Sequence, residues 1–188
     1  LFERQLEPEV YSFRLLDALM KEAGRRGITS YPIHIKIDTG MHRLGFRPSD
    51  VREICQRLEQ QSSLVVRSVF SHLVGSDSPE HDEFTRGQIR LFTQSAEALE
   101  AGLGYPVLKH ILNSAGIERF TGHQMDMVRL GISLYGISAS VSEAKKLQPV
   151  SSLKTTILQI RDVPAGDSIG YSRKTYAQRD LRVAILPI

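Results

Sequence analysis

A lysine, an aspartate and an arginine lie close together in one short stretch of this chain. Residues 33–38 alternate isoleucine with polar side chains, so that Lys36 and Asp38 share one face of a predicted strand. Gly40 permits a tight exit from the strand, and Arg43 follows on the loop. The planar guanidinium of an arginine matches a carboxylate. The pattern predicts a charged strand face that leads to a binding site.

Further polar residues have sequence surroundings that allow a functional role. His72 ends a predicted strand, which is where barrel enzymes place functional residues. Arg129 stands between apolar residues and is costly to bury unless it is paired. Asn113 and Ser114 lie in a short polar turn, and Tyr171 follows a glycine in a β-rich stretch. Residue type alone leaves structural alternatives open: a structural histidine, a salt bridge, a helix cap and a hairpin tyrosine.

Several segments resemble one known family in the same order. Residues 36–45 closely resemble a signature of alanine racemases, which use pyridoxal phosphate (PLP). Similar matches follow at residues 71–77, 112–115, 127–136, 152–155 and 163–171. The resemblance covers nearly the whole chain from about Pro32 onward. The matches are weak singly and specific together.

The resemblance implies a PLP site built around Arg129. PLP supplies an electron sink for chemistry at an amino acid α-carbon. In the family the arginine that matches Arg129 faces the pyridine nitrogen and keeps it unprotonated. Backbone N–H groups at Gly131 and Ile132, together with Asn113 and Ser114, would hold the phosphate. The expected cofactor site therefore contains these five residues together with His72 and Arg43.

The resemblance also implies four catalytic residues: Tyr171, Arg43, His72 and Arg129. Tyr171 matches the family's catalytic tyrosine, one of two bases, which comes from the other subunit of a head-to-tail homodimer; Tyr176 is the nearest competitor. His72 would link Arg129 to this tyrosine. Arg43 would contact the phenolic oxygen of PLP and the substrate carboxylate.

Lys36 aligns with a lysine that is often carbamylated in this family. The modification would turn its cation into an anion and hold Arg43 in place. Unmodified Lys36 would instead repel Arg43. Carbamylation of Lys36 is therefore a hypothesis at this stage.

One part of the family's machinery is absent from this sequence. The second base, which also forms the Schiff base with PLP, lies in a motif near Lys-Ala-Asn-Ala-Tyr-Gly, and no such motif occurs here. The chain also begins without methionine and stops within an apolar stretch at residues 184–188. We expect an internal fragment, inactive alone, of an alanine racemase that supplies D-alanine for peptidoglycan, with or without a fused ligase domain.

Strand-like and helix-like segments alternate along most of the chain. Helices are expected at residues 11–26, from a capping box at Asp50 to about 60, and up to about 101 with Leu91 on its inner side. Expected strands are 33–38, 65–72, 107–112 and 128–135. The pattern predicts an α/β fold: part of a (β/α)8 TIM-type barrel over residues 1–140, then the start of an all-β domain over 150–188, with strand-like residues at 181–188.

Composition excludes several classes of protein. The chain has 188 residues and a net charge of +3, and its basic residues are scattered, which argues against a nucleic-acid surface. No apolar run approaches the roughly 18 residues of a membrane span. The single cysteine, Cys55, is expected to have an apolar packing role and fits a cytoplasmic protein. The spacing of Asp77, His81 and Asp82 fits no strong metal pattern.

Three other functions remain open. One is a related barrel PLP enzyme, such as an amino acid decarboxylase or a serine-type racemase. A PLP-carrier protein is a second, although such proteins lack a following β domain. The third is a degenerate binding or scaffold domain, against which the presence of Arg43, His72, Arg129 and Tyr171 argues.

Overall fold

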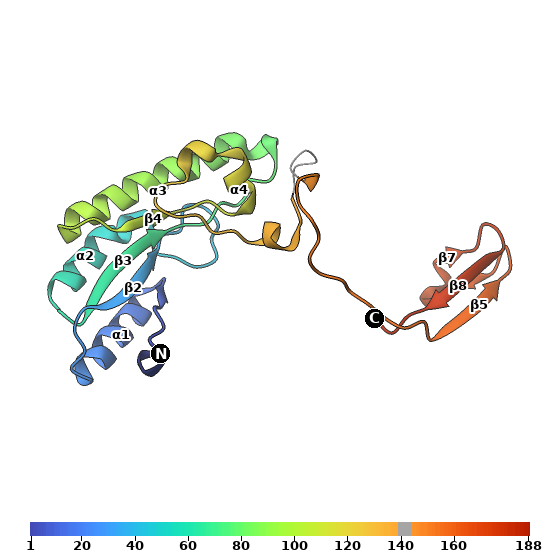
Figure 1. The fold of residues 1–188 in the computed structure, drawn as a ribbon, viewed down its shortest axis with the longest axis horizontal. Helices are drawn as coiled ribbons and strands as arrows, with labels where there is room; N and C mark the ends of the chain where they lie inside the picture. The colour runs from blue at the N-terminus through green and yellow to red at the C-terminus, as the bar shows by residue number, and fades with distance from the viewer. Residues whose placement is uncertain (139–143) are drawn as a thin grey trace. The chain divides into compact units, whose positions relative to one another are not determined.

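Four parallel strands in the order β1-β2-β3-β4 form the centre of the first part of the molecule (Figure 1). The computed structural model describes residues 1–138 and 144–188, and it divides into two units, Leu1–Val150 and Ser151–Ile188. The strands and helices of the first unit are β1 (Glu9–Val10), α1 (Phe13–Arg25), β2 (Tyr31–Lys36), α2 (Val51–Glu59), β3 (Leu64–Phe70), α3 (Asp82–Leu103), β4 (Leu108–His110) and α4 (Ser114–Arg119). Parallel neighbours joined by helices are consecutive units of a barrel, which confirms the predicted fold class.

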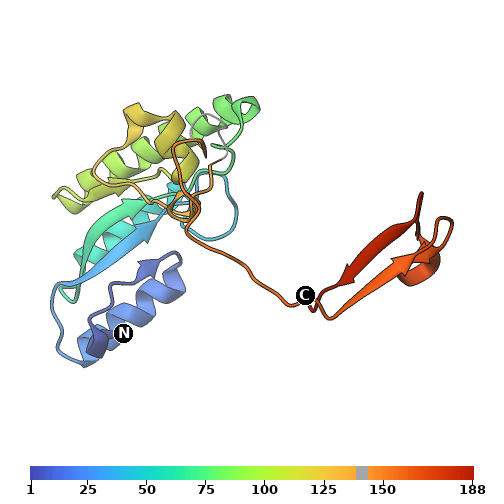
Figure 2. The same ribbon diagram turned by 45° about the vertical axis from the view of Figure 1, so that its right-hand side comes forward.

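The two faces of β2 have opposite chemistry, as the alternation predicted. Ile33, Ile35 and the following Ile37 are fully buried in the apolar core. The helices contribute to the same core, and α3 runs alongside α2 (Figures 1 and 2). The opposite face of β2 carries His34 and Lys36, which form hydrogen bonds to polar side chains. This polar face is the one that positions the candidate site.

The helices α2 and α3 differ from the sequence-based predictions at one position each. The predicted capping box at Asp50 is wrong: its carboxylate accepts a hydrogen bond from the backbone N–H of Arg47, one turn earlier, and does not cap α2. Leu91 is 38% exposed rather than facing inward. The buried positions of α3 recur every three or four residues, and Leu91 lies beside that stripe. Cys55 is half-buried against the core, as expected.

The predicted strand at residues 128–135 is also wrong. The backbone N–H of Arg129 donates to the carbonyl of Leu112, and that of Gly131 donates to the hydroxyl of Ser114. A short 3-10 helix, η5, follows at Ile132–Tyr135. The N–H groups that a strand would use in a ladder are therefore directed at Leu112 and Ser114, at the point where the chain enters α4. This route of the backbone brings Arg129 to the carboxyl ends of the sheet strands.

The second unit contains two antiparallel ribbons. Strand β5 (Gln159–Val163) pairs with β8 (Leu181–Ile185) (Figure 1). Strand β6 (Ser168–Ile169) pairs with β7 (Thr175–Tyr176). The structure confirms the predicted β-rich segment, although the strand predicted at 181–188 ends at Ile185. Among the described residues of this unit, Ala177 is the one buried apolar side chain.

None of the helices in the described parts of the chain combines the length and the apolar character that crossing a membrane requires.

Candidate active site

Arg129 lies at the centre of a hydrogen-bonded cluster at the carboxyl ends of β3 and β4. Its guanidinium donates to the backbone carbonyls of Ser71, His110 and Ile111, the last two at 3.2 and 3.3 Å. It also donates to the Nδ1 atoms of His110, at 2.6 Å, and His72, at 3.3 Å. Burial lowers the pKa of Arg129 to about 10, so it remains a cation at neutral pH. The site thus holds a positive charge in a fixed orientation.

The two histidines next to Arg129 are neutral acceptors. Burial lowers the pKa of His110 to about 4, and the charge of Arg129 acts in the same direction. Burial also lowers the pKa of His72, with further contributions from Arg129, Arg43 and Lys36. Because a guanidinium can only donate, the Nδ1 atom that receives its hydrogen bond must be unprotonated.

That constraint fixes the direction of a longer chain of hydrogen bonds. The Nε2–H of His110 donates to the hydroxyl of Ser68 at 3.2 Å, since its Nδ1 is the acceptor. Ser68 then donates to Nδ1 of His34 at 2.6 Å, and Nε2–H of His34 donates to Glu7 at 2.9 Å. Sequence analysis missed the roles of these residues. His110 is the last residue of β4, but the strand predicted from the sequence continued to residue 112, so the rule that selected His72 did not single out His110.

Ser114 and Gly131 form a small polar cradle next to this cluster. The Ser114 hydroxyl oxygen accepts the backbone N–H groups of Gly131, at 2.9 Å, and Ser133, at 3.3 Å. Its own hydrogen is therefore available to a group in the adjoining cavity. Asn113 instead caps α4: its side-chain oxygen accepts from the N–H of Gly116 at 2.9 Å. The structural alternative left open for Asn113, a helix cap, is present.

One cavity of about 610 Å³ brings most of the expected cofactor residues together. Its lining includes His72, Asn113, Ser114, Arg129, Gly131 and Ile132. The N–H groups of Gly131 and Ser133 are taken up by the Ser114 oxygen, so the donor offered to an anion is the Ser114 hydroxyl hydrogen, and the Arg129 cation lies in the same wall. The cavity therefore combines a hydroxyl donor with a fixed positive charge.

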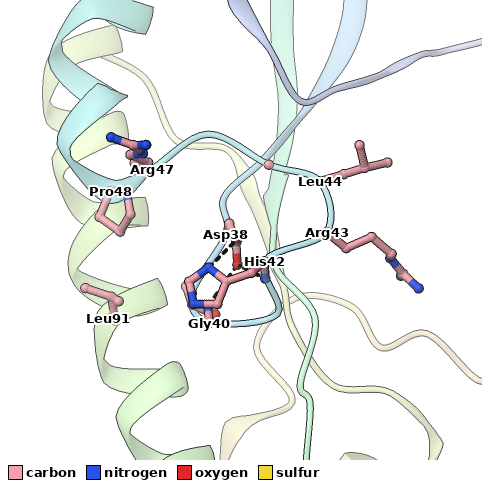
Figure 3. Close-up of a pocket in the computed structure, with 10 residues that line it drawn as sticks. Asp38, Gly40, His42, Arg43, Leu44, Arg47, Pro48 and Leu91 are labelled. Carbon is pink, nitrogen blue, oxygen red and sulfur yellow. Dashed lines mark hydrogen bonds and ion pairs between the residues drawn. The ribbon is translucent and has the colours of Figure 1, made fainter.

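Arg43 lies on a loop next to this cavity but outside its lining. The loop is fixed by Asp38, whose carboxylate accepts the N–H groups of Gly40, Met41 and His42 (Figure 3). Burial by itself raises the pKa of Asp38, and these three donors outweigh that effect and lower it. The Arg43 side chain is exposed and points away from Asp38 (Figure 3).

A second cavity, of about 730 Å³, lies on the α3 side of the same loop. It is lined by residues that include His42, Arg43, Arg47, Pro48 and Leu91 (Figure 3). It is the larger of the two, and its lining includes neither Arg129 nor Ser114. Apart from Arg43, the residues expected to bind the cofactor line the smaller cavity.

Lys36 has a partner that the sequence did not indicate. Its ammonium donates to a carboxylate oxygen of Glu9 at 2.8 Å, and the lysine side chain is only 10% exposed. Glu9 belongs to β1, the neighbour of β2, so that the pairing of these strands brings the two charges together.

Tyr171 belongs to the second unit, where its side chain is 99% exposed. It begins the 3-10 helix η6 (Tyr171–Arg173), directly after the turn at Gly170. Within the part of the chain that the structure describes, no contact orients the phenol hydroxyl of Tyr171.

The described acidic residues and histidines do not assemble into a metal site. Within residues 1–138 and 144–188, histidine, cysteine, aspartate and glutamate side chains form no group of three or more that could hold a metal ion. Asp82 instead forms a salt bridge with Arg119 at 2.7 Å.

Comparisons with known proteins agree on one family. Residues 1–139 match the family model for the alanine racemase N-terminal domain, and residues 150–188 match the model for the alanine racemase C-terminal domain. A curated relative, alanine racemase 1 of Oceanobacillus iheyensis, is 37% identical over 95% of this chain and 48% of its own length. The chain spans about half the length of the curated relatives it matches.

Solved structures show the same likeness. An alanine racemase from Clostridium difficile is similar over 97% of this chain and 48% of its own, with 27% identity and a TM-score of 0.73. A structure from Bartonella henselae, described as alanine racemase with covalently bound pyridoxal phosphate, shares the fold at 21% identity, with a TM-score of 0.72; it covers 98% of this chain and 49% of its own.

Proposed function

This chain belongs to the alanine racemase family, and we propose that the protein of which it forms part interconverts L-alanine and D-alanine with PLP as its cofactor. The observation that carries the proposal is the position of Arg129. A guanidinium held by three carbonyls and two neutral histidines lies in the wall of the cavity that Ser114 also lines. This arrangement offers a fixed cation to a ring nitrogen and a hydroxyl donor to a phosphate.

The residues present fit PLP. The Ser114 hydroxyl has a hydrogen left to donate, and Gly131 brings backbone close to it; with Asn113 and Ile132 they would hold the phosphate. Arg129 would face the pyridine nitrogen. When bound, PLP supplies the sink for the electron pair released at the α-carbon. Because Arg129 stays charged at neutral pH, it opposes protonation of that nitrogen and would limit side reactions such as transamination.

Proton transfer is assigned to Tyr171 and to a lysine outside this chain. Tyr171 is proposed to act on one face of the α-carbon, within a homodimer in which it comes from the second subunit. His72 is neutral and its Nδ1 accepts from Arg129, so its Nε2–H would donate a hydrogen bond toward that tyrosine. Arg43, whose guanidinium is exposed and unobstructed, would bind the substrate carboxylate.

We propose that the chain alone does not racemise alanine. Its lysines stand in contexts unlike the family motif that anchors PLP, so the second base is missing. The cytoplasmic location and the supply of D-alanine for peptidoglycan are further parts of the proposal that follow from the family.

The test is the formation of D-alanine from L-alanine with added PLP, comparing this chain with the complete protein. We expect activity in the complete protein only. If neither forms D-alanine, the alanine assignment fails, and release of carbon dioxide from amino acids would then identify a decarboxylase. Turnover by the chain alone would show that one of its own lysines anchors PLP.

A further inference from the structure

The pair formed by Glu9 and Lys36 joins a buried lysine to a glutamate whose side chain is 39% exposed. Lys36 is 10% exposed, and its Nζ lies 2.8 Å from a Glu9 oxygen. The side chain of Lys36 also passes over the ring of Phe70, with Nζ 5.4 Å from the ring centroid. These contacts hold the lysine head in one position on the polar face of the sheet.

A second cation lies at the same ring. The Arg129 guanidinium carbon is 5.1 Å from the Phe70 centroid, and His110 stacks on that ring with its centroid 4.9 Å away. Two cations near one aromatic ring repel each other, and a negative charge close by offsets that repulsion. Glu9 is that charge: it accepts a hydrogen bond from Lys36, and its field opposes the lowering of the pKa of Arg129 by burial.

The same contact bears on the hypothesis that Lys36 is carbamylated. Carbamylation requires the free amine: the Nζ lone pair attacks carbon dioxide, a nitrogen–carbon bond forms, one carbon–oxygen π bond breaks, and a proton leaves for solvent. The product would place an anion on Lys36 within hydrogen-bonding range of the Glu9 carboxylate. Two carboxylates in that position disfavour each other strongly.

We propose that Glu9 is the resident carboxylate of this site: it keeps Lys36 as an unmodified ammonium and supplies, from the protein itself, the negative charge that a carbamate would bring. Glu9 is thus a positioning residue, which acts through Lys36. The inference rests on the proposed function only in taking PLP as the group that Arg129 faces in the cavity. The charge pair itself does not depend on it.

The experiment is carbon-13 NMR of the complete protein in labelled bicarbonate, with the Lys36→Arg variant to identify any signal that belongs to Lys36. We expect no Lys36 carbamate in the unaltered protein. Glu9→Gln removes the like charge, so a Lys36 carbamate signal should appear, at least about tenfold above the background of the unaltered protein. Glu9→Asp should again give no signal above that background.

The matched control is Glu7→Gln. Glu7 lies two residues earlier and bonds His34 and Arg67 rather than Lys36, so this variant should show no carbamate. Circular dichroism of each variant establishes that it is folded. A Lys36 carbamate in the unaltered protein overturns the proposal. So does its absence in a folded Glu9→Gln protein, because the carboxylate would then not be what prevents it. Neither readout depends on racemase activity, so this inference and the proposed function can fail separately.

Discussion

Each of the two units of this chain is stabilised internally by a different kind of interaction. In the first unit, sheet and helices bury one continuous apolar core that includes Ile35, Ile54 and Phe92, each fully buried. In the second unit, Ile157, Ile160 and most other apolar side chains are exposed, and backbone hydrogen bonds between paired strands define the structure. Burial of apolar surface stabilises a folded unit far more than the backbone hydrogen bonds of an isolated two-stranded ribbon do.

The candidate catalytic groups follow the same division. Arg129, His72 and His110 lie in the first unit, where carbonyls and neutral rings fix their orientation. Tyr171 lies in the second unit and is almost fully exposed. One region therefore offers a group whose orientation is set by its neighbours, and the other offers a group that other parts of the active protein must orient.

The largest expected effect is on catalytic activity and tests the role of the exposed Tyr171. Replacing Tyr171 by Phe in the complete protein should lower kcat/KM for alanine by about 10²–10⁴, the range for loss of a general base. Tyr176→Phe, in the same unit, is the matched control and should retain activity. Equal losses in both variants, measured as D-alanine formation, would mean that the unit tolerates neither change and that Tyr171 has no special role.

Shortening one apolar side chain in each unit compares what apolar burial contributes to the stability of the two units. Phe92→Ala should lower the free energy of unfolding by about 3–5 kcal/mol, because it empties a fully buried position. Ile160→Ala, at a position 57% exposed in β5, should change it by less than about 0.5 kcal/mol. Urea unfolding of this chain followed by circular dichroism measures both. A comparable cost at Ile160 would show that the second unit has a core of its own.

The buried histidines make the first unit sensitive to acid. The pKa of His110 is about 4 in the folded chain and 6.5 ordinarily, so between these values the unfolded state binds more protons. Stability from this group is therefore complete above pH 6.5 and is lost as the pH falls toward 4, by about 2–3 kcal/mol.

The measurement is urea unfolding at a series of pH values. His110→Gln should flatten the dependence in this window, whereas His123→Gln, at an exposed position, should leave the slope unchanged. An unaltered slope in His110→Gln would place the acid sensitivity elsewhere.

The smallest effect tests a single hydrogen bond inside the first unit. The Ser12 hydroxyl accepts the N–H of Leu15 at 3.4 Å and caps α1. Ser12→Ala should cost about 0.5–1 kcal/mol of unfolding free energy, well below the cost of Phe92→Ala. The same unfolding titration checks it, with Ser49→Ala as an exposed control. A cost as large as that of the core change would contradict the view that burial dominates this unit.

Local patterns were sufficient to predict the elements that carry their own signal. The isoleucines of β2, the stripe of α3 that includes Phe92, and the β-rich character of the stretch after residue 150 follow from spacing and residue type. The stretch at 128–135 was predicted wrongly because its apolar residues are compatible with a strand. The backbone N–H groups of Gly131 and Ser133 are directed instead to Ser114, a partner that no local pattern reveals.

The sequence by itself determined which residue types are available for chemistry and the order in which the family-like segments follow one another. Only the tertiary structure decided which of them meet. Glu9 reaches Lys36 across 27 positions and His110 reaches Ser68 across 42, because the register of parallel strands sets which polar side chains face one another. Strand register depends on the packing of the whole sheet against its helices, so these contacts could not be read from any single segment.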